Sequence, residues 1–315
     1  MSVRFSRGSW LIGSAAAGVG SIVPRPGRSA ESAPIKVATV PREPALECFY
    51  AQELGFFQKR GLTVEITMMS NGAAIGAAVA GGAIHIGNSN VLALAQARQH
   101  NVPLIMIAPA GVHDARYPNS GCVVAAGSTI ASPKELNGKV VAGASVGSYD
   151  QLCVSTLIDK DGGDSSTVKF VELPQPAMAD ALVAGRVVAA SMSDPELSAA
   201  RAAGRVRVIG DAESAVAKNS ILTAWISTND WLAANKDTAR LFAAAIFDAA
   251  KWSMAHPKEA AVILGTRTGI KEQLAQQRFA TNFDPSMLQP VLDAATKYKM
   301  LAGSISAADI AWNGK

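Results

Sequence analysis

Short apolar runs and longer amphipathic segments alternate along the chain from residue 35 onward. Runs rich in β-branched side chains predict strands at 35–40, 63–68, 83–86 and 103–108. The segments between them have helical character and predict helices at 43–59, 73–80 and 91–100. Because strands and helices alternate, we expect a mostly parallel sheet with helices on both faces.

The alternation starts again after a polar segment at 111–119, which contains His113, Asp114 and Arg116. Strands are predicted at 122–126, 139–142, 167–172, 187–192, 206–209 and 221–227. From residue 229 the pattern is helical only, with helices expected at 237–255, 257–264 and 285–300. The chain is therefore expected to form two α/β lobes followed by helices.

Residues 70–90 hold two polar segments that suit ligand binding. Ser70 and Asn71 precede the predicted helix at 73–80 and can cap it. Residues 87–90 are predicted to form a polar loop at the carboxyl end of a strand. Ligands of open α/β sheets bind beyond the carboxyl ends of strands. Since no nucleophile, base or metal cluster accompanies these segments, the pattern favours binding over catalysis.

The first 32 residues have the features of an export signal. Arg4 and Arg7 precede an apolar run at 10–23, which is too short to span a membrane. Small residues then lead to an expected cleavage site before Ala33, and no cysteine precedes Cys48 for lipid attachment. We therefore expect an exported protein that is not a lipoprotein. The segment resembles a twin-arginine signal but lacks the second arginine, so export by the Sec route and export by the twin-arginine route both stay open.

Charge and cysteine content exclude several classes of protein. The chain has 29 basic and 25 acidic residues, a net charge of +4. The leader holds four arginines and one glutamate, so the remainder carries 25 basic and 24 acidic residues, a net charge of +1. Such a balance does not support nucleic-acid binding. Cys48, Cys122 and Cys153 lack metal-ligand spacing and favour core packing over a disulfide, so no metal or cofactor is expected.

Three segments resemble a known family in their expected order. Residues 55–65 (GFFQKRGLTVE) run from an aromatic helix end into a strand, residues 132–140 (SPKELNGKV) open the second lobe, and residues 181–195 end in Asp194-Pro195. The chain in this respect resembles the periplasmic substrate-binding proteins of ABC importers for nitrate, sulfonates, taurine and thiamine-pyrimidine precursors. The resemblance runs from about residue 35 to the end. His85 stands where the family usually has aspartate, and we expect a structural role for it.

The resemblance implies a type II periplasmic binding protein, in which two lobes joined by two crossings close around a ligand. The crossings are expected near 110–119 and 227–231. We therefore expect the chain to divide into an export signal and two lobes. The signal would span 1–32, lobe 1 would comprise 33–112 and 228–315, and lobe 2 would span 113–227. The implied partners are a small-molecule ligand and the permease and ATPase subunits of an importer, and we expect a monomer.

Predicted ligand residues follow from the rule about strand ends and helix starts. They are Pro41, Arg42, Ser70, Asn71, Gly72, Asn88, Ser89, Asn90, Gly147, Ser148, Tyr149 and Asp194. Helix starts such as Gly147-Ser148 attract anionic oxygens, which favours an oxyanion. Asp194 favours an amine, hydroxyl or ring N–H instead, unless it only caps a helix. The charge of the ligand, which is expected to be polar and oxyanionic or aromatic, therefore stays open.

Two other classes of protein fit part of the pattern. A related fold makes the thiamine pyrimidine with a cysteine-rich motif and iron, but no two cysteines here lie close in sequence. We therefore expect no enzymatic activity. A ligand-sensing protein that docks to a membrane receptor would have the same two lobes. Neighbouring genes for a permease and an ATPase would separate a transport protein from a sensor.

Overall fold

The computed structural model describes most of the chain, namely residues 33–40, 45–268 and 278–314. The expected export signal at 1–32 and the predicted ligand residues Pro41 and Arg42 lie outside the described residues. No helix in the described part combines the length and hydrophobicity needed to cross a bilayer.

The first sheet has five strands and is mostly parallel. Its order is β2 (Val64–Met68), β1 (Ile35–Thr39), β3 (Ile86–Asn90), β12 (Thr223–Thr228) and β4 (Leu104–Pro109). β1 pairs in parallel with both β2 and β3. β12 comes from much later in the chain and is antiparallel to both of its neighbours, β3 and β4.

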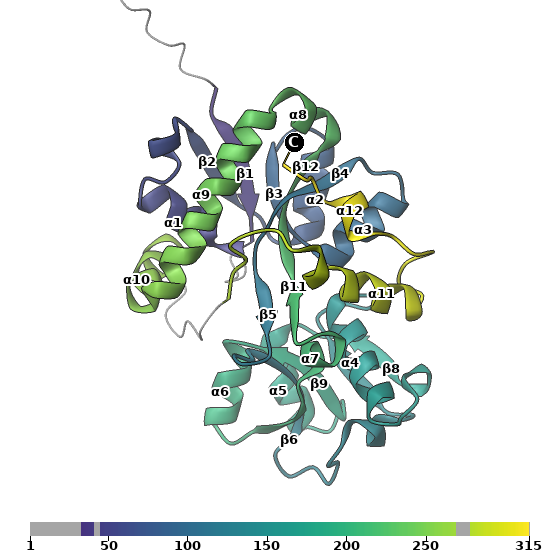
Figure 1. Cartoon of the computed structure of the whole chain (residues 1–315). Helices are drawn as coiled ribbons and strands as arrows, with labels where there is room; N and C mark the ends of the chain where they lie inside the picture. The colour runs from purple at the N-terminus through teal and green to yellow at the C-terminus, as the bar shows by residue number, and fades with distance from the viewer. Residues whose placement is uncertain (1–32, 41–44, 269–277, 315) are drawn as a thin grey trace, which may run out of the picture. The chain divides into compact units, whose positions relative to one another are not determined.

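Helices cover both faces of this sheet, as the alternating pattern predicts (Figure 1). The face that carries Val37 and Trp225 packs against α1 (Glu47–Glu53), α9 (Lys236–Ala255) and α10 (Pro257–Thr268). The face that carries Ala38 and Ile226 packs against α2 (Gly72–Ala80), α3 (Val91–Gln99) and α12 (Ala307–Ile310). The short helix α8 (Asn229–Ala234) follows β12 directly.

Gly87 of β3 lets α2 lie close to the sheet. A Cβ atom at this position would be 2.3 Å from Cγ2 of Ile75 and 2.9 Å from Cγ2 of Val79. Both distances are far below van der Waals contact, so only glycine fits unless α2 moves. Gly87 therefore fixes the α2 side of the sheet and leaves its neighbour Asn88 to face α1 and α9.

The second sheet also has five strands. Its order is β10 (Val206–Gly210), β6 (Ser120–Ala125), β9 (Ala189–Ser193), β7 (Val140–Gly143) and β8 (Lys169–Glu172). β7 is parallel to β8 and β9, and β6 is antiparallel to β9 and β10. One face packs against α5 (Gln175–Val183) and α6 (Glu196–Ala202). The other face packs against α4 (Tyr149–Lys160) and α7 (Ala212–Val216).

Two short strands connect the sheets. The chain leaves β4 through β5 (Val112–Asp114) and returns through β11 (Asn219–Ile221), and these strands pair antiparallel to each other (Figure 1). The first crossing agrees with the expected range of 110–119. The second comes before the expected 227–231, because β12 already pairs with β3 and β4 in the first sheet.

The late helix α11 (Gln289–Lys297) contacts elements of both halves. It packs against α3 near the first sheet and against α4 and α7 near the second. Tyr298, just beyond α11, donates a 2.7 Å hydrogen bond from its hydroxyl to Oδ2 of Asp159 in α4. The predicted core role of the cysteines is confirmed, since Cys48, Cys122 and Cys153 are buried and free.

Candidate functional site

A pocket of about 780 Å³ opens beside the two crossing strands. Val112 and Asp114 line it from β5, and Asn219 lines it from β11. The end of α9 contributes Met254, and the segment that precedes α11 contributes Arg278 and other residues up to Pro290. The lining therefore combines the strands that join the sheets with a segment that returns to the first sheet.

Arg116 and Asp114 form the most strongly bonded pair in this lining. The guanidinium donates from Nε and Nη2 to the Asp114 carboxylate at 2.6–3.2 Å, and the backbone N–H of Arg116 donates to Oδ1 at 3.0 Å. These hydrogen bonds lower the pKa of Asp114 to about 2. Asp114 is therefore a charged but compensated carboxylate, while the Arg116 side chain is 78% exposed at the pocket edge.

Arg278 is a second cation in the lining, and its polar atoms are incompletely paired. Its guanidinium carbon lies 3.6 Å from the centroid of the Tyr117 ring, a close cation–π contact. Its Nε is buried without a hydrogen-bond partner among the described residues. A buried donor without a partner is rare in folded proteins. Arg278 can therefore donate to an acceptor that enters the pocket.

The pocket also has an apolar wall. Met254, Phe279 and Met287 contribute to it, and Phe279 packs edge-on against Tyr50 of α1 with ring centroids 6.4 Å apart. An anionic group beside Arg278 and an apolar body against this wall could be held together. Ligand sites commonly combine a few polar groups with such an apolar lining.

The predicted residues at 70–72 and 89 lie together at one end of the first sheet. Asn71 caps α2, because its Oδ1 accepts from the N–H of Ala74 at 2.8 Å. A Cβ on Gly72 would lie 3.6 Å from Oγ of Ser89, so these two residues are neighbours. Ser70 is exposed and accepts from Asn71. Asn90 caps the next helix, accepting from Leu92 N–H at 2.8 Å.

Asn88 lies inside a strand, where the sequence predicted a loop over 87–90. β3 extends through Asn90 because β12 pairs with this stretch, and Asn88 lies directly opposite Trp225. Opposite residues of an antiparallel pair point to the same face. Asn88 is 1% exposed, and both its Nδ2 and Nε1 of Trp225 are buried without a partner among the described residues.

Glu47 adds a buried carboxylate on the same face. It opens α1 and is fully buried, and neither carboxylate oxygen has a hydrogen-bond partner in the described part of the chain. Burial in these surroundings raises the pKa of Glu47 well above its usual range. Glu47, Asn88 and Trp225 are thus three polar groups on one face of the sheet whose pairing is incomplete.

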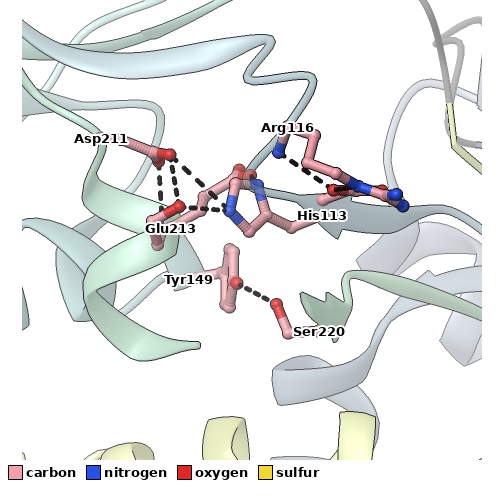
Figure 2. Close-up of polar contacts among 8 residues, drawn as sticks. His113, Arg116, Tyr149, Asp211, Glu213 and Ser220 are labelled. Carbon is pink, nitrogen blue, oxygen red and sulfur yellow. Dashed lines mark hydrogen bonds and ion pairs between the residues drawn. The ribbon is translucent and has the colours of Figure 1, made fainter. Parts of the chain in front are cut away.

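The predicted residues of the second half are already engaged within the protein. Ser148 donates from Oγ to the Ser145 carbonyl at 2.7 Å, and Gly147 donates from its N–H to Gln151. Tyr149 is buried, and its hydroxyl lies 3.3 Å from Oγ of Ser220 (Figure 2).

Asp194 has the geometry of a helix cap. Its Oδ1 accepts from the N–H of Ser198 at 3.0 Å and from Oγ of Ser198 at 2.6 Å, which stabilises the start of α6. The alternative of helix capping, left open by the sequence, thus has a structural basis.

His85 has structural contacts in agreement with the role expected for it. Its Nδ1 accepts from the backbone N–H of Lys36 at 3.1 Å, and its ring stacks on Trp231. Partial burial and the nearby Lys36 lower the pKa of His85.

None of the predicted ligand residues within the described ranges lines the pocket. Two of its polar groups, Asp114 and Arg116, belong to the segment at 111–119 that the sequence marked as a crossing. The segment from Arg278 onward was missed, because a single arginine between predicted helices carries no local signal of a site.

A family model described as "NMT1/THI5 like" matches residues 45–260. No curated protein matches the chain. Solved structures with similar folds include the periplasmic aliphatic sulphonate binding protein SsuA from Escherichia coli, with a TM-score of 0.72 and 15% identity over 89% of this chain and 92% of that chain.

Two further solved structures extend the comparison. The alkanesulfonate-binding protein SsuA from Xanthomonas axonopodis pv. citri, bound to MOPS, has a TM-score of 0.71 and 16% identity over 90% of this chain and 99% of that chain. The desulfurization enzyme DSZB has a TM-score of 0.63 and 12% identity over 88% of this chain and 96% of that chain. At such identities the likeness establishes the periplasmic-binding-protein fold alone.

Proposed function

The chain belongs to the NMT1/THI5-like family, and we propose that it is the extracytoplasmic solute-binding component of an ABC importer. The observation that carries this proposal is the pocket beside β5 and β11, the two strands that join the sheets. A ligand held there contacts both the crossing strands and the segment that returns to the first sheet. Binding can therefore be coupled to a hinge motion of the two lobes.

The proposed ligand is a small polar organic molecule with an anionic group and an apolar body. Arg278 supplies a positive charge and a donor, Nε, that has no partner among the described residues, and Arg116 supplies a second, exposed cation. Met254 and Phe279 supply the apolar contact. Two of the similar structures are described as sulfonate-binding proteins, which makes sulfonates the first compounds to test.

The remaining features of the proposal follow from the sequence. Residues 1–32 are proposed as a cleaved export signal, and the chain from residue 33 as two lobes built on the two sheets and joined by β5 and β11, with β12 in the first lobe. The protein would act in the periplasm as a monomer, deliver its ligand to a permease and its ATPase, and catalyse no reaction. Ser70 to Gly72, Asn88 to Asn90, Gly147 to Tyr149 and Asp194 are proposed to approach the ligand when the lobes close.

A ligand screen followed by calorimetry tests the proposal. The purified protein from Ala33 onward is screened by thermal shift against sulfonates, carboxylates, pyrimidines and flavins, because a true ligand stabilises the folded state. Affinity for the best compound is then measured for the parent and for Arg278→Gln. A hydrogen bond to a charged group contributes about 1.5–3 kcal/mol, so the variant should bind roughly ten- to a hundredfold more weakly.

Arg240→Gln is the matched control, because Arg240 is an exposed arginine of α9 outside the pocket lining. It should bind like the parent. No stabilising compound in the screen, or equal affinities for the parent and Arg278→Gln, would contradict the proposed pocket. Chemical conversion of a bound compound by the purified protein would contradict the binding function itself.

A further inference from the structure

His113 is a buried histidine in the middle of the first crossing strand, β5. Its side chain is 1% exposed, and it lies opposite Ser220 of the second crossing strand. It points toward α7, the helix that precedes β11 (Figure 2). A titratable side chain therefore sits where the two sheets are joined.

Both ring nitrogens of His113 face oxygen atoms of α7 or its cap. Nε2 lies 2.9 Å from Oγ of Ser214, and Nδ1 lies 2.9 Å from Oε2 of Glu213, an ion-pair distance without hydrogen-bond geometry. Oδ2 of Asp211 is 3.8 Å from Nε2. Ser214 donates its own hydroxyl proton to Asp211, so its oxygen accepts from Nε2–H. The doubly protonated imidazolium fits this arrangement.

Among the described groups that shift the pKa of His113, none is a cation. Asp114 on the same strand is an anion bonded to Arg116, while Tyr149 and Cys153 of α4 are buried, which raises the pKa of each. Burial alone would lower the pKa of His113, but Glu213, Asp211 and Asp114 outweigh it, and the net direction is upward. The protonated form is therefore the form that these surroundings stabilise.

We propose that protonated His113 ties the first crossing strand to α7, and that loss of this proton loosens the paired crossing strands. The raised pKa in the folded state fixes the sign of the effect. The stabilisation is fully present below the unfolded pKa, about 6.5 for histidine, and is lost as the pH rises through the folded pKa. The paired crossing strands β5 and β11 are thus most rigid in mildly acidic medium and become less rigid as the pH rises.

The order Ser214, His113, Glu213 also has the connectivity of a nucleophile, a base and an orienting acid. The hydroxyl proton of Ser214, however, goes to Asp211 rather than to His113. A nucleophilic serine would have to donate its hydroxyl proton to the histidine instead. The contacts therefore favour a tie between strand and helix.

Nuclear magnetic resonance of ¹³C-labelled histidine tests the proposal without any ligand. His113→Gln assigns the His113 signal among the four histidines. We expect the titration midpoint of His113 to lie above about 6.5, the value of unfolded histidine, and Glu213→Gln to lower it. Glu172→Gln, an exposed change on β8, should leave it unchanged. A His113 midpoint at or below about 6.5, or one that Glu213→Gln does not move, overturns the proposal.

Hydrogen exchange measures the loosening itself. After correction for the intrinsic rate at each pH, protection of the amides in β5 and β11 should fall in the parent as the pH rises through the His113 midpoint. His113→Gln should show no such fall, and Asp211→Asn provides a second variant if that protein does not fold. A pH-independent protection in the parent, or covalent labelling of Ser214 by a fluorophosphonate, contradicts the proposal.

Discussion

Glu47→Gln should remove a pH-dependent loss of stability. Glu47 is fully buried at the start of α1, and neither of its oxygens has a partner among the described residues. Burial raises its pKa well above the usual range, so the folded protein holds this proton after the unfolded chain has released it. The folded state then binds one more proton, and stability falls as the pH rises between the two pKa values.

The magnitude follows from the same linkage. One bound proton changes the free energy of unfolding by about 1.4 kcal/mol for each pH unit. The unfolded pKa of glutamate is about 4.3, so the loss begins near pH 5 and continues up to the folded pKa. The glutamine side chain of the variant has nearly the same shape as glutamate and no proton to release. The stability advantage of Glu47→Gln over the parent should therefore grow by about 1.4 kcal/mol for each pH unit from pH 5 up to the folded pKa.

Urea unfolding at a series of pH values measures this difference directly, with a common slope for the two proteins. Glu53→Gln is the matched control on the same helix, since Glu53 is half-exposed and pairs with Arg267. It should show no growth of this kind. A stability difference for Glu47→Gln that stays constant with pH would refute the reasoning, because Glu47 would then titrate as an exposed carboxyl does.

Two substitutions on β3 test the two faces of the first sheet. Asn88→Leu removes a buried amide whose Nδ2 lacks a partner among the described residues. The variant should bind ligand more weakly, while its stability to urea without ligand should stay within about 1 kcal/mol of the parent. Unchanged affinity in calorimetry would argue against a ligand role for Asn88. Gly87→Ala places a Cβ 2.3 Å from Ile75 and should cost about 1–3 kcal/mol in urea unfolding. Gly127→Ala, where a Cβ meets nothing within 4 Å, should stay near the parent, and equal stability of the two variants would contradict the close approach of α2.

The alternation of strands and helices was enough to predict the fold class. The spacing of apolar residues along each element reflects which of its faces is buried, and this spacing differs between strands and helices. It failed at the carboxyl end of β3. Gly87 to Asn90 have loop-like composition, yet they form a strand. The partner strand β12 lies far later in the chain and supplies the backbone hydrogen bonds that this segment needs. A local pattern carries no information about such a distant partner.

The candidate site was only partly predictable for a related reason. The sequence placed Asp114 and Arg116 in a polar segment at an expected crossing and not among the ligand residues, yet both line the pocket. The backbone carbonyl of Arg278 accepts from Val112 N–H, and this contact brings Arg278 beside β5 although the two lie far apart in the sequence. Asp194 and Asn90 were predicted as ligand residues from their place near strand ends. Both cap helices, a role that the same residue types perform equally well.

Small-angle X-ray scattering with and without a ligand from the screen tests the central claim most directly. A binding protein with two lobes joined by β5 and β11 should become more compact when a saturating ligand is added, and the parent should return to its initial radius of gyration after dialysis. The ligand should be recovered chemically unchanged. An unchanged radius of gyration at saturation, or a converted compound after dialysis, would contradict the account.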